Sequence, residues 1–340
     1  MTRGASIYLV TRVHGLRTHL ITQHDIQILA KARRLKDISD SLMKTDYAPE
    51  IGQLPTEEQD AATLESIFLR KLVQRFFFVR RTAQGKMQDL LGRYCARFEV
   101  ENIKRVIRTK HGRSTDEPDL IPLQREYSLV NFPALVKAKD IDEVASLLRD
   151  TPYHSLREKL QPYTESGTSL ILEAALDQIF FSRVWEMARK VTGIKDLFGT
   201  EMDLRNLLIT FSLKNSGASP RLIEEAVIPL SYKLPSAILR SLIQGRLEDA
   251  PNVLTAAYSK LASEAVSMLK SSSSGRLEWL FSEELYADAS VALVARPLQA
   301  GYILAYLLLC EREARNLVSI VTGKRLNLSE EEISKGLYGF

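Results

Sequence analysis

The chain contains one short sequence pattern three times. In each copy an acidic residue precedes an asparagine by three positions, isoleucine or leucine follows the asparagine directly, and a lysine lies eight positions beyond it. The three copies are Glu99, Asn102 and Lys110; Asp203, Asn206 and Lys214; and Glu313, Asn316 and Lys324. The asparagines are 104 and 110 positions apart in a chain of 340 residues. A fixed period of this kind predicts three similar folded units on one chain.

Two further landmarks recur in the same order. Leu-Glu pairs open an apolar stretch upstream of each pattern, with spacings of 108 and 105, at residues 64–65, 172–173 and 277–278. Further upstream, Leu42–Tyr47 matches Leu148–Tyr153, and the third copy keeps only Tyr258. Polar breaks rich in proline or glycine support boundaries near residues 122 and 229. We therefore expect three helical repeats, at residues 1–122, 123–229 and 230–340.

The apolar residues follow a helical period. One stripe runs through Leu64, Ile67, Phe68, Leu72, Phe76 and Val79, and a second through Leu172, Leu176, Ile179, Phe180, Val184 and Met187. This spacing places each set on one face of a helix with 3.6 residues per turn. Ser329 followed by Glu332 has the spacing of a capping box that opens a helix. Asn-Gly and Asp-Gly hairpin signals are absent, so the sequence predicts an all-α fold.

The repeated acid and asparagine would share one face of a helix, since they lie three positions apart. Asparagine is unfavourable inside a helix, so a recurrent one indicates a hydrogen-bonding task. One interpretation is structural: the amide ties its helix to a neighbour, and the acid and lysine complete a polar network. The other is a ligand site. We favour the structural interpretation, because a threefold active site would ordinarily need histidine, cysteine or paired acids as well.

Motifs for common chemistry are not found in the sequence. It has no phosphate-binding GxxxxGK[ST] loop, no GxGxxG, no GxSxG and no HExxH. His14, His19 and His24 are spaced by five, which advances about 140° around a helix and puts them on different faces. Cys95 and Cys310 each sit in an apolar context and are expected to be buried free thiols. We therefore expect no catalytic residue, no metal and no cofactor.

The sequence gives no sign of a membrane or secretion segment. The longest apolar run, Leu298–Cys310, is shorter than the roughly 20 residues that cross a bilayer. The first seven residues contain no apolar core of a signal peptide. These features predict a protein of the cytoplasm.

Charge is unevenly distributed. Residues 1–113 hold 21 Lys or Arg and 12 Asp or Glu, although the whole chain has a net charge of only +4. Such asymmetry can indicate contact with nucleic acid, anionic lipid or an acidic protein face, or simply a solvated surface. Between Phe68 and Arg81, basic residues alternate with Phe76, Phe77 and Phe78, as in some nucleic-acid-binding segments. However, Phe68 and Phe76 also fit the core stripe, and no recognised nucleic-acid module is present.

Three stretches resemble one protein family. Tyr8–Leu20, Phe98–Lys104 with Lys110, and Cys310–Leu317 continuing to Lys324 resemble the opening, central and C-terminal motifs of the C subunits of A/V-type ATP synthases, which are related to the d subunit of the eukaryotic V-ATPase. The likeness covers nearly the whole chain, and the C-terminal stretch is its most specific part. This sequence departs from the family pattern at His14, Thr322 and Asn327, which affects individual contacts more than the assignment.

The resemblance implies a fold and a role. The fold would be a funnel of three helical units with pseudo-threefold symmetry. The role would be non-enzymatic: one end seats on the membrane proteolipid (c/K) ring, and the open end receives the rotating shaft, which consists of the D and F subunits. The protein would then be peripheral on the cytoplasmic face of the membrane and bind no nucleic acid. Candidate partner contacts are Arg12, Arg17, Arg80 and Arg81. The alternatives are a helical-repeat scaffold with other partners or a basic nucleic-acid-binding protein.

Overall fold

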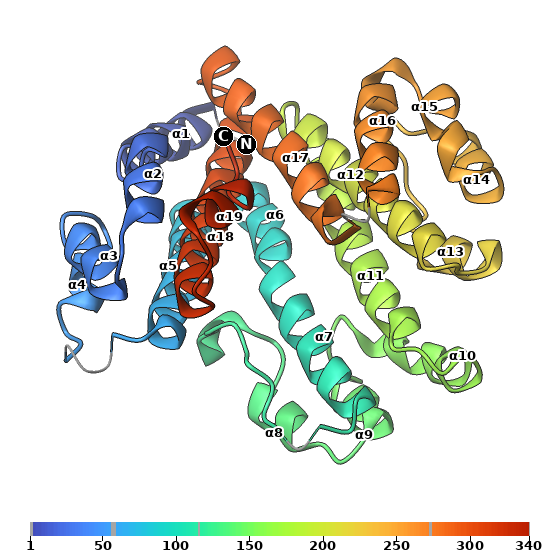
Figure 1. The fold of residues 1–340 in the computed structure, drawn as a ribbon. Coiled ribbons are helices and arrows are strands. Elements are labelled where there is room, and N and C mark those ends of the chain that lie inside the picture. Colours follow the sequence, from blue (N-terminus) through green and yellow to red (C-terminus); the bar gives the residue numbers. More distant parts are fainter. Residues whose placement is uncertain (1–2, 56–58, 115, 272–273, 340) are drawn as a thin grey trace. The chain divides into compact units, whose positions relative to one another are not determined.

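In the computed structural model every regular element of the described residues is a helix (Figure 1). These residues are 3–55, 59–114, 116–271 and 274–339. The predicted all-α class is therefore confirmed. The chain forms two compact units, one of residues 1–91 and 286–340 and the other of residues 92–285. The division falls inside α6 (Lys86–Cys95) and α17 (Leu277–Ala295).

The first unit combines both ends of the chain. Its other helices are α1 (Arg3–Arg17), α2 (Gln23–Lys31), α3 (Leu35–Leu42), α4 (Ala48–Ile51), α5 (Ala61–Thr82), α18 (Gly301–Arg325) and α19 (Glu330–Lys335). The two long helices α5 and α18 pack along each other, and α2 contacts both α18 and α19 (Figure 1). Helices from opposite ends of the sequence therefore share one core.

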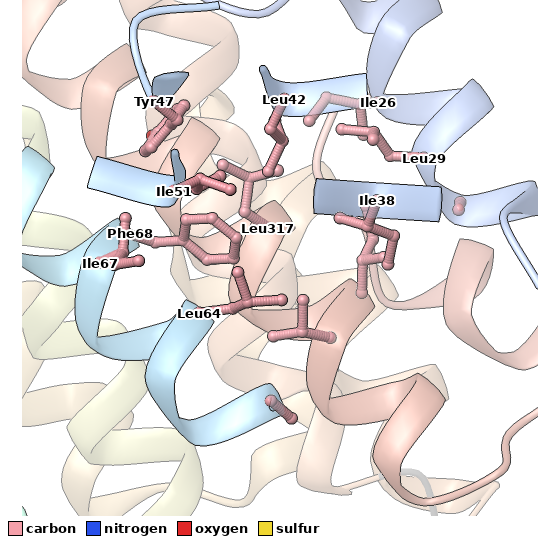
Figure 2. Close-up of a cluster of buried hydrophobic side chains, with 14 of the residues drawn as sticks. Ile26, Leu29, Ile38, Leu42, Tyr47, Ile51, Leu64, Ile67, Phe68 and Leu317 are labelled. Carbon is pink, nitrogen blue, oxygen red and sulfur yellow. The ribbon is translucent and has the colours of Figure 1, made fainter. Parts of the chain in front are cut away.

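That core is a cluster of aliphatic and aromatic side chains. Figure 2 shows Leu42 of α3, Tyr47 before α4, Phe68 of α5 and Leu317 of α18 converging on one another. Phe68 and Leu317 are fully buried. Full burial of a Leu, Ile or Phe side chain contributes about 1.5–3 kcal/mol each, so this cluster is a main attachment of the N-terminal helices to α5 and α18.

Local signals explain where the helices of this unit begin. α5 follows Asp60, whose carboxylate accepts a hydrogen bond from the backbone N–H of Thr63 at 2.8 Å. α19 follows Ser329, and both hydrogen bonds of its capping box with Glu332 are present, as predicted. Each cap satisfies backbone donors that the first helical turn leaves without a partner. The stripe predicted from Leu64 to Val79 lies on α5, within Ala61–Thr82.

The second unit is a continuous stretch of chain. Its helices are α7 (Arg97–His111), α8 (Phe132–Lys137), α9 (Ile141–Leu147), α10 (Leu160–Ser166), α11 (Leu170–Ala188), α12 (Ile194–Asn215), α13 (Pro220–Ala226), α14 (Ser236–Gln244), α15 (Ala250–Val253) and α16 (Ala256–Lys270). α11 packs against both α7 and α12. Phe180 and Phe181 of α11 contact Phe198 of α12 ring to ring, which fixes how these two helices meet.

The apolar run Leu298–Cys310 has a simple structural explanation. Every residue from Gly301 to Cys310 is buried, and α18 packs against α5 and α1 of its own unit. A helix that is apolar on all sides is typical of a protein core. Among the described residues no helix is long and apolar enough to cross a membrane. The sequence also has four serines and a glycine at Ser271–Gly275, a composition that predicts a loop or linker, and residues 272 and 273 of this stretch lie outside the described residues.

Candidate functional site

The three repeated asparagines have the same hydrogen bonds. Each is buried, and each side-chain amide accepts from the backbone N–H and donates to the backbone C=O of a single residue 19 or 22 positions downstream. The pairs are Asn102 with Ile121, Asn206 with Ile228 and Asn316 with Tyr338. A buried backbone outside a helix needs such partners. Each asparagine therefore fixes the start of a non-helical segment against its own helix.

The three repeated acids also have equivalent surroundings. Each accepts a hydrogen bond from a tyrosine hydroxyl and at least one from a backbone N–H. The tyrosine partners are Tyr153 for Glu99 at 2.7 Å, Tyr258 for Asp203 at 3.0 Å and Tyr47 for Glu313 at 2.8 Å. These tyrosines are the ones that the sequence marks as an upstream landmark. The sequence analysis did not predict that these tyrosines bond the acids. The signal that could have indicated it is the recurrence of one tyrosine in each repeat.

The three repeated lysines reach backbone carbonyl oxygens. Lys110 donates to Val136, Lys214 to Ile243 and Gly245, and Lys324 to Ala30, at 2.6–2.7 Å. Each acceptor lies at or near the end of a short helix, α8, α14 or α2. Cations are favourable at helix C-termini, where carbonyl groups lack helical partners. The lysine thereby attaches this short helix to the end of the long one.

We call the segment that contacts the asparagine, acid and lysine of one repeat its cap segment. The first two cap segments are continuous, residues 121–153 and 228–258. The third contains Tyr338 near the C-terminus and residues 21–47 near the N-terminus. The third cap segment is thus formed by two stretches that lie far apart in sequence.

The part of the third cap segment from Ala30 to Tyr47 corresponds to residues 136–153 of the first. Ala30 and Tyr47 have the roles of Val136 and Tyr153, and both pairs are 106 positions apart. The backbone also agrees: the cap residue Ala32 after α2 has φ −54° and ψ 140°, and Ala138 after α8 has φ −54° and ψ 139°. The third repeat is completed by residues that the sequence pattern assigns to the first.

The third network also contains an ion pair. Arg75 Nη1 of α5 lies 2.6 Å from Glu313 Oε1, and both side chains are buried. Its Nη2 lies 3.6 Å from Asp46. Counted from the Leu-Glu pairs, the position of Arg75 is occupied by Arg183 in the second repeat and by Asp288 in the third. Arg75 was not predicted from the sequence, where it looked like one of many basic residues in its helix.

A second buried ion cluster lies in the second unit. Asp177 of α11 contacts Lys104 of α7 at 2.5 Å and Arg205 of α12 at 2.8 Å. Burial would raise the pKa of Asp177, but the charges of Arg205 and Lys104 outweigh it and hold this pKa below its usual value. One carboxylate thus joins three helices. Sequence reasoning did not find this cluster, because its three members share no spacing.

The buried titratable groups near Glu313 are poorly suited to catalysis. Burial raises the pKa of the Cys310 thiol to about 12, which leaves it as an unreactive thiol at neutral pH. Burial and the charge of Glu313 raise the pKa of Tyr47 well above its usual value. Cys95 is also buried and free, so the expectation for both cysteines is confirmed. This network can position helices, but it presents no activated nucleophile.

The four candidate partner contacts lie in the first unit. Arg12 and Arg17 of α1 and Arg81 of α5 are exposed, and Arg80 is partly exposed. The aromatic residues beside Arg80 and Arg81 are not available to nucleic acid, because Phe68, Phe76 and Phe77 are buried in the core. Phe78 is partly buried, and the guanidinium of Arg12 lies 5.7 Å from the centre of its ring. No base-stacking surface is formed by these phenylalanines.

Comparison with known proteins places this arrangement in a family. Residues 9–336, nearly the whole chain, match the family model described as ATP synthase (C/AC39) subunit. The chain belongs to this family. It is 25% identical to the C subunit of the A-type ATP synthase of Haloquadratum walsbyi over 96% of both chains. It is 27% identical to that of Methanothermobacter thermautotrophicus over 94% of this chain and 83% of the other.

Family membership confirms the resemblance that three sequence motifs predicted. It makes the chain part of a multi-subunit ATP synthase, a structural component of the rotary complex that is not itself catalytic. The repeated acids, asparagines and lysines all lie within the part of the chain that matches the family, whereas Tyr338, the partner of Asn316, lies just beyond it.

Proposed function

We propose that this chain is the central-stalk component that couples the rotating D/F shaft to the membrane proteolipid ring. The names of its relatives support a place in an A-type ATP synthase. The observation that carries the mechanical role is the threefold recurrence of one buried network, with the third copy assembled from both chain ends. In this proposal the chain transmits torque, and ion flow is coupled to ATP synthesis or hydrolysis elsewhere in the complex.

We further propose that the three repeats, at 1–122, 123–229 and 230–340, surround a pseudo-threefold axis as a funnel. Equivalent hydrogen bonds in three repeats support this arrangement, because they require equivalent neighbours. An open array of repeats has two end repeats that need special capping. Here residues 21–47 supply the cap of the last repeat. Because residues of the first repeat thus cap the last one, this contact supports a closed ring of repeats.

The nine repeat residues have a structural role in this proposal. They hold non-helical cap segments onto long helices through buried side chains, and they bind no metal and no cofactor. Densely packed interiors deform little and transmit strain. A torque-coupling protein needs this stiffness, since shear within it would waste rotation.

The partner surfaces are also part of the proposal. Arg12, Arg17, Arg80 and Arg81 would face acidic groups of the shaft or the ring, where complementary charge speeds association. The protein would lie at the cytoplasmic face of the membrane and attach to it only through the ring. Stable protein–protein interfaces of this kind bury on the order of 1,000 Å² or more for each partner.

The decisive experiment is reconstitution. The purified chain should bind the D/F shaft complex and a detergent-solubilised proteolipid ring, and the complex lacking it should hydrolyse ATP without pumping ions. A chain that binds neither partner would contradict the proposal and favour a scaffold with other partners. Filter binding of DNA and RNA across salt concentrations tests the nucleic-acid alternative, and we expect no specific retention.

A further inference from the structure

Two pairs of long helices meet in a similar way in different parts of the chain. α7 packs against α11 in the second unit, and α18 packs against α5 in the first. In each pair, a helix that carries the acid and asparagine pattern meets a helix with a Leu-Glu pair near its start. Similar helices of this kind could exchange partners between two copies of the chain, which is a characteristic failure of repeat proteins.

The acid of the repeated pattern does not distinguish the two helix pairs. Glu313 of α18 pairs with Arg75 of α5. The equivalent residues of the other helix pair are Glu99 of α7 and Arg183 of α11. Both α7 and α18 therefore carry an acid at this position, and both α5 and α11 carry an arginine. After an exchange of partners each arginine would again meet an acid, so these residues do not select one partner.

A second pair of charged residues is present in only one of the two helix pairs. Lys104 of α7 lies 2.5 Å from Asp177 of α11, and their exposed fractions are 3% and 7%. Counted from the asparagine, the residue of α18 equivalent to Lys104 is Val318. Counted from the Leu-Glu pair, the residue of α5 equivalent to Asp177 is Leu69. Equivalent positions thus hold lysine and aspartate in one helix pair, and valine and leucine in the other.

This difference penalises the wrong pairing more than it stabilises the right one. The cost of removing two charges from water largely offsets their attraction, whereas a buried charge that loses its counter-charge is strongly destabilising. If α7 packed against α5, Lys104 would lie against Leu69 with no counter-charge. Asp177 would keep the contact of its second carboxylate oxygen with Arg205 of α12. The penalty therefore falls mainly on the lysine.

We propose that the buried pair of Lys104 and Asp177 selects α11 as the partner of α7, and thereby prevents two copies of this chain from exchanging equivalent helices. The inference goes beyond the proposed function and does not depend on it. Specific pairing often requires a feature that disfavours the wrong partner, because apolar contacts alone discriminate poorly between similar surfaces. In this chain Lys104 is that feature.

The test changes the charged pair and follows refolding of the full chain. Lys104→Met removes the selecting charge and leaves Asp177 paired with Arg205. Lys104→Val/Asp177→Leu places the residues of the α5 and α18 pair in the α7 and α11 pair. Each chain is unfolded in urea and refolded over a range of protein concentrations. Sedimentation velocity then gives the fraction of protein in dimers and larger species, and circular dichroism gives its helix content.

We expect the wild type to refold to monomers. Lys104→Met should keep a melting temperature close to that of the wild type, while its fraction of dimers with native helix content rises at least about 5-fold at equal concentration. Lys104→Val/Asp177→Leu should form at least as many dimers. When chains labelled with a donor dye and chains labelled with an acceptor dye are refolded together, energy transfer should appear for these variants and not for the wild type.

The matched control is Arg108→Gln/Glu173→Gln, which removes another ion pair between the same two helices. The side chain of Arg108 is 49% exposed, so this pair leaves no buried charge behind and its loss should not change the monomer fraction.

Three results would overturn the inference. If Lys104→Met refolds to the same fraction of monomers as the wild type, the pair does not select the partner of α7, whatever its melting temperature. If the control forms as many dimers as Lys104→Met, the effect belongs to lost charge in general. If Lys104→Met does not fold, the pair is required for folding itself and not for the choice between partners.

Discussion

The Asp203 and Glu313 networks solve one problem in two ways. Asp203 lies in a continuous stretch, and its carboxylate accepts from three consecutive backbone N–H groups, those of residues 232–234, and from Tyr258. Glu313 accepts from Ile21 N, from the hydroxyl of Tyr47 and from Arg75 Nη1. One acid is held by a backbone cradle, and the other by an ion pair among segments far apart in sequence.

The difference follows from how the chain is connected. A cradle of consecutive amides can form only where the cap segment continues past the helix, as it does after α12. Where the cap segment consists of two stretches far apart in sequence, as for Glu313, the covalent chain does not hold these stretches together. Burial would lower the pKa of Arg75, but the charge of Glu313 outweighs it and raises this pKa, so the guanidinium stays charged. The junction between residues 21–47, α5 and α18 therefore depends on a buried counter-ion.

The largest expected effect comes from removing that counter-ion. Glu313→Gln leaves the guanidinium of Arg75 buried without its main partner, and breaking a buried pair from one side costs about 3–5 kcal/mol. Asp203→Asn leaves no stranded cation and should cost about 1–3 kcal/mol. Hydrogen exchange of peptides from α2 and α18 reports the first unit, and peptides from α12 and α16 report the second.

The comparison is sharpened by a double variant. Arg75→Met combined with Glu313→Gln removes both charges, and it should recover a large part of the protection that Glu313→Gln alone loses. If the double variant is no more protected than Glu313→Gln, the ion pair does not set the stability of the junction. A loss for Asp203→Asn as large as that for Glu313→Gln would erase the distinction between the two networks.

A glycine in the first unit gives the next largest effect. A Cβ added at Gly323 of α18 would lie 2.6 Å from the side chain of Ile333 of α19, close to the C-terminal part of the third cap segment. Gly323→Ala must push the two helices apart, and overpacking of this kind costs about 1–3 kcal/mol. The matched control is Gly15→Ala on α1, where nothing lies within 4 Å. It should be neutral or stabilising by up to about 1 kcal/mol.

Thermal unfolding of both variants checks this. Equal melting temperatures for Gly323→Ala and Gly15→Ala would show that α19 can move away from α18 at little cost. The packing of α19 would then contribute little to the stability of the first unit. The tighter approach is expected because Asn316 fixes Tyr338 at 2.8 Å only a few residues beyond Ile333.

Sequence predicted the elements of this fold better than their partners. The stripe from Leu64 to Val79 located α5, because a helical period is a local property of the chain. The spacing of Glu313 and Asn316 marked the polar network but not its members Arg75 and Ile21. Those come from more than 200 positions away, and pairing at such distance leaves no periodic trace. The tyrosines are an intermediate case, because the sequence shows that they recur in each repeat but does not show which acid each one bonds.

Two buried acids of the second unit, Asp177 and Asp203, should change the stability of the protein with pH in opposite directions. The pKa of Asp177 is lowered, so its contribution to stability is present above its unfolded pKa, about 3.9, and is lost as the pH falls below it. Burial raises the pKa of Asp203, despite the hydrogen bonds that favour its charged form. Its contribution is therefore fully present below about pH 3.9 and is lost as the pH rises above it. The slope of either effect is at most about 1.4 kcal/mol per pH unit.

Urea unfolding followed by tryptophan fluorescence measures both, because Trp185 and Trp279 lie in the second unit. The advantage of the wild type over Asp177→Asn should shrink as the pH falls from about 5 to 3. Its advantage over Asp203→Asn should shrink in the opposite direction, as the pH rises from about 4 to 6. Parallel pH profiles for the two variants would mean that the backbone cradle and the ion cluster hold their acids in the same charge state.

The smallest effect concerns Arg80 and Arg81, two basic residues at the end of α5 in the first unit. Arg80→Glu/Arg81→Glu should lower affinity for the shaft and ring by less than about 1 kcal/mol at physiological salt, because exposed charge pairs are screened and individually weak. Association at low salt should slow more, since steering acts at long range. Arg221→Glu in the second unit, where the side chain is 90% exposed, is the control. Assembly rates that fall equally for both changes would assign the effect to net charge, and the two units would then be electrostatically equivalent for docking.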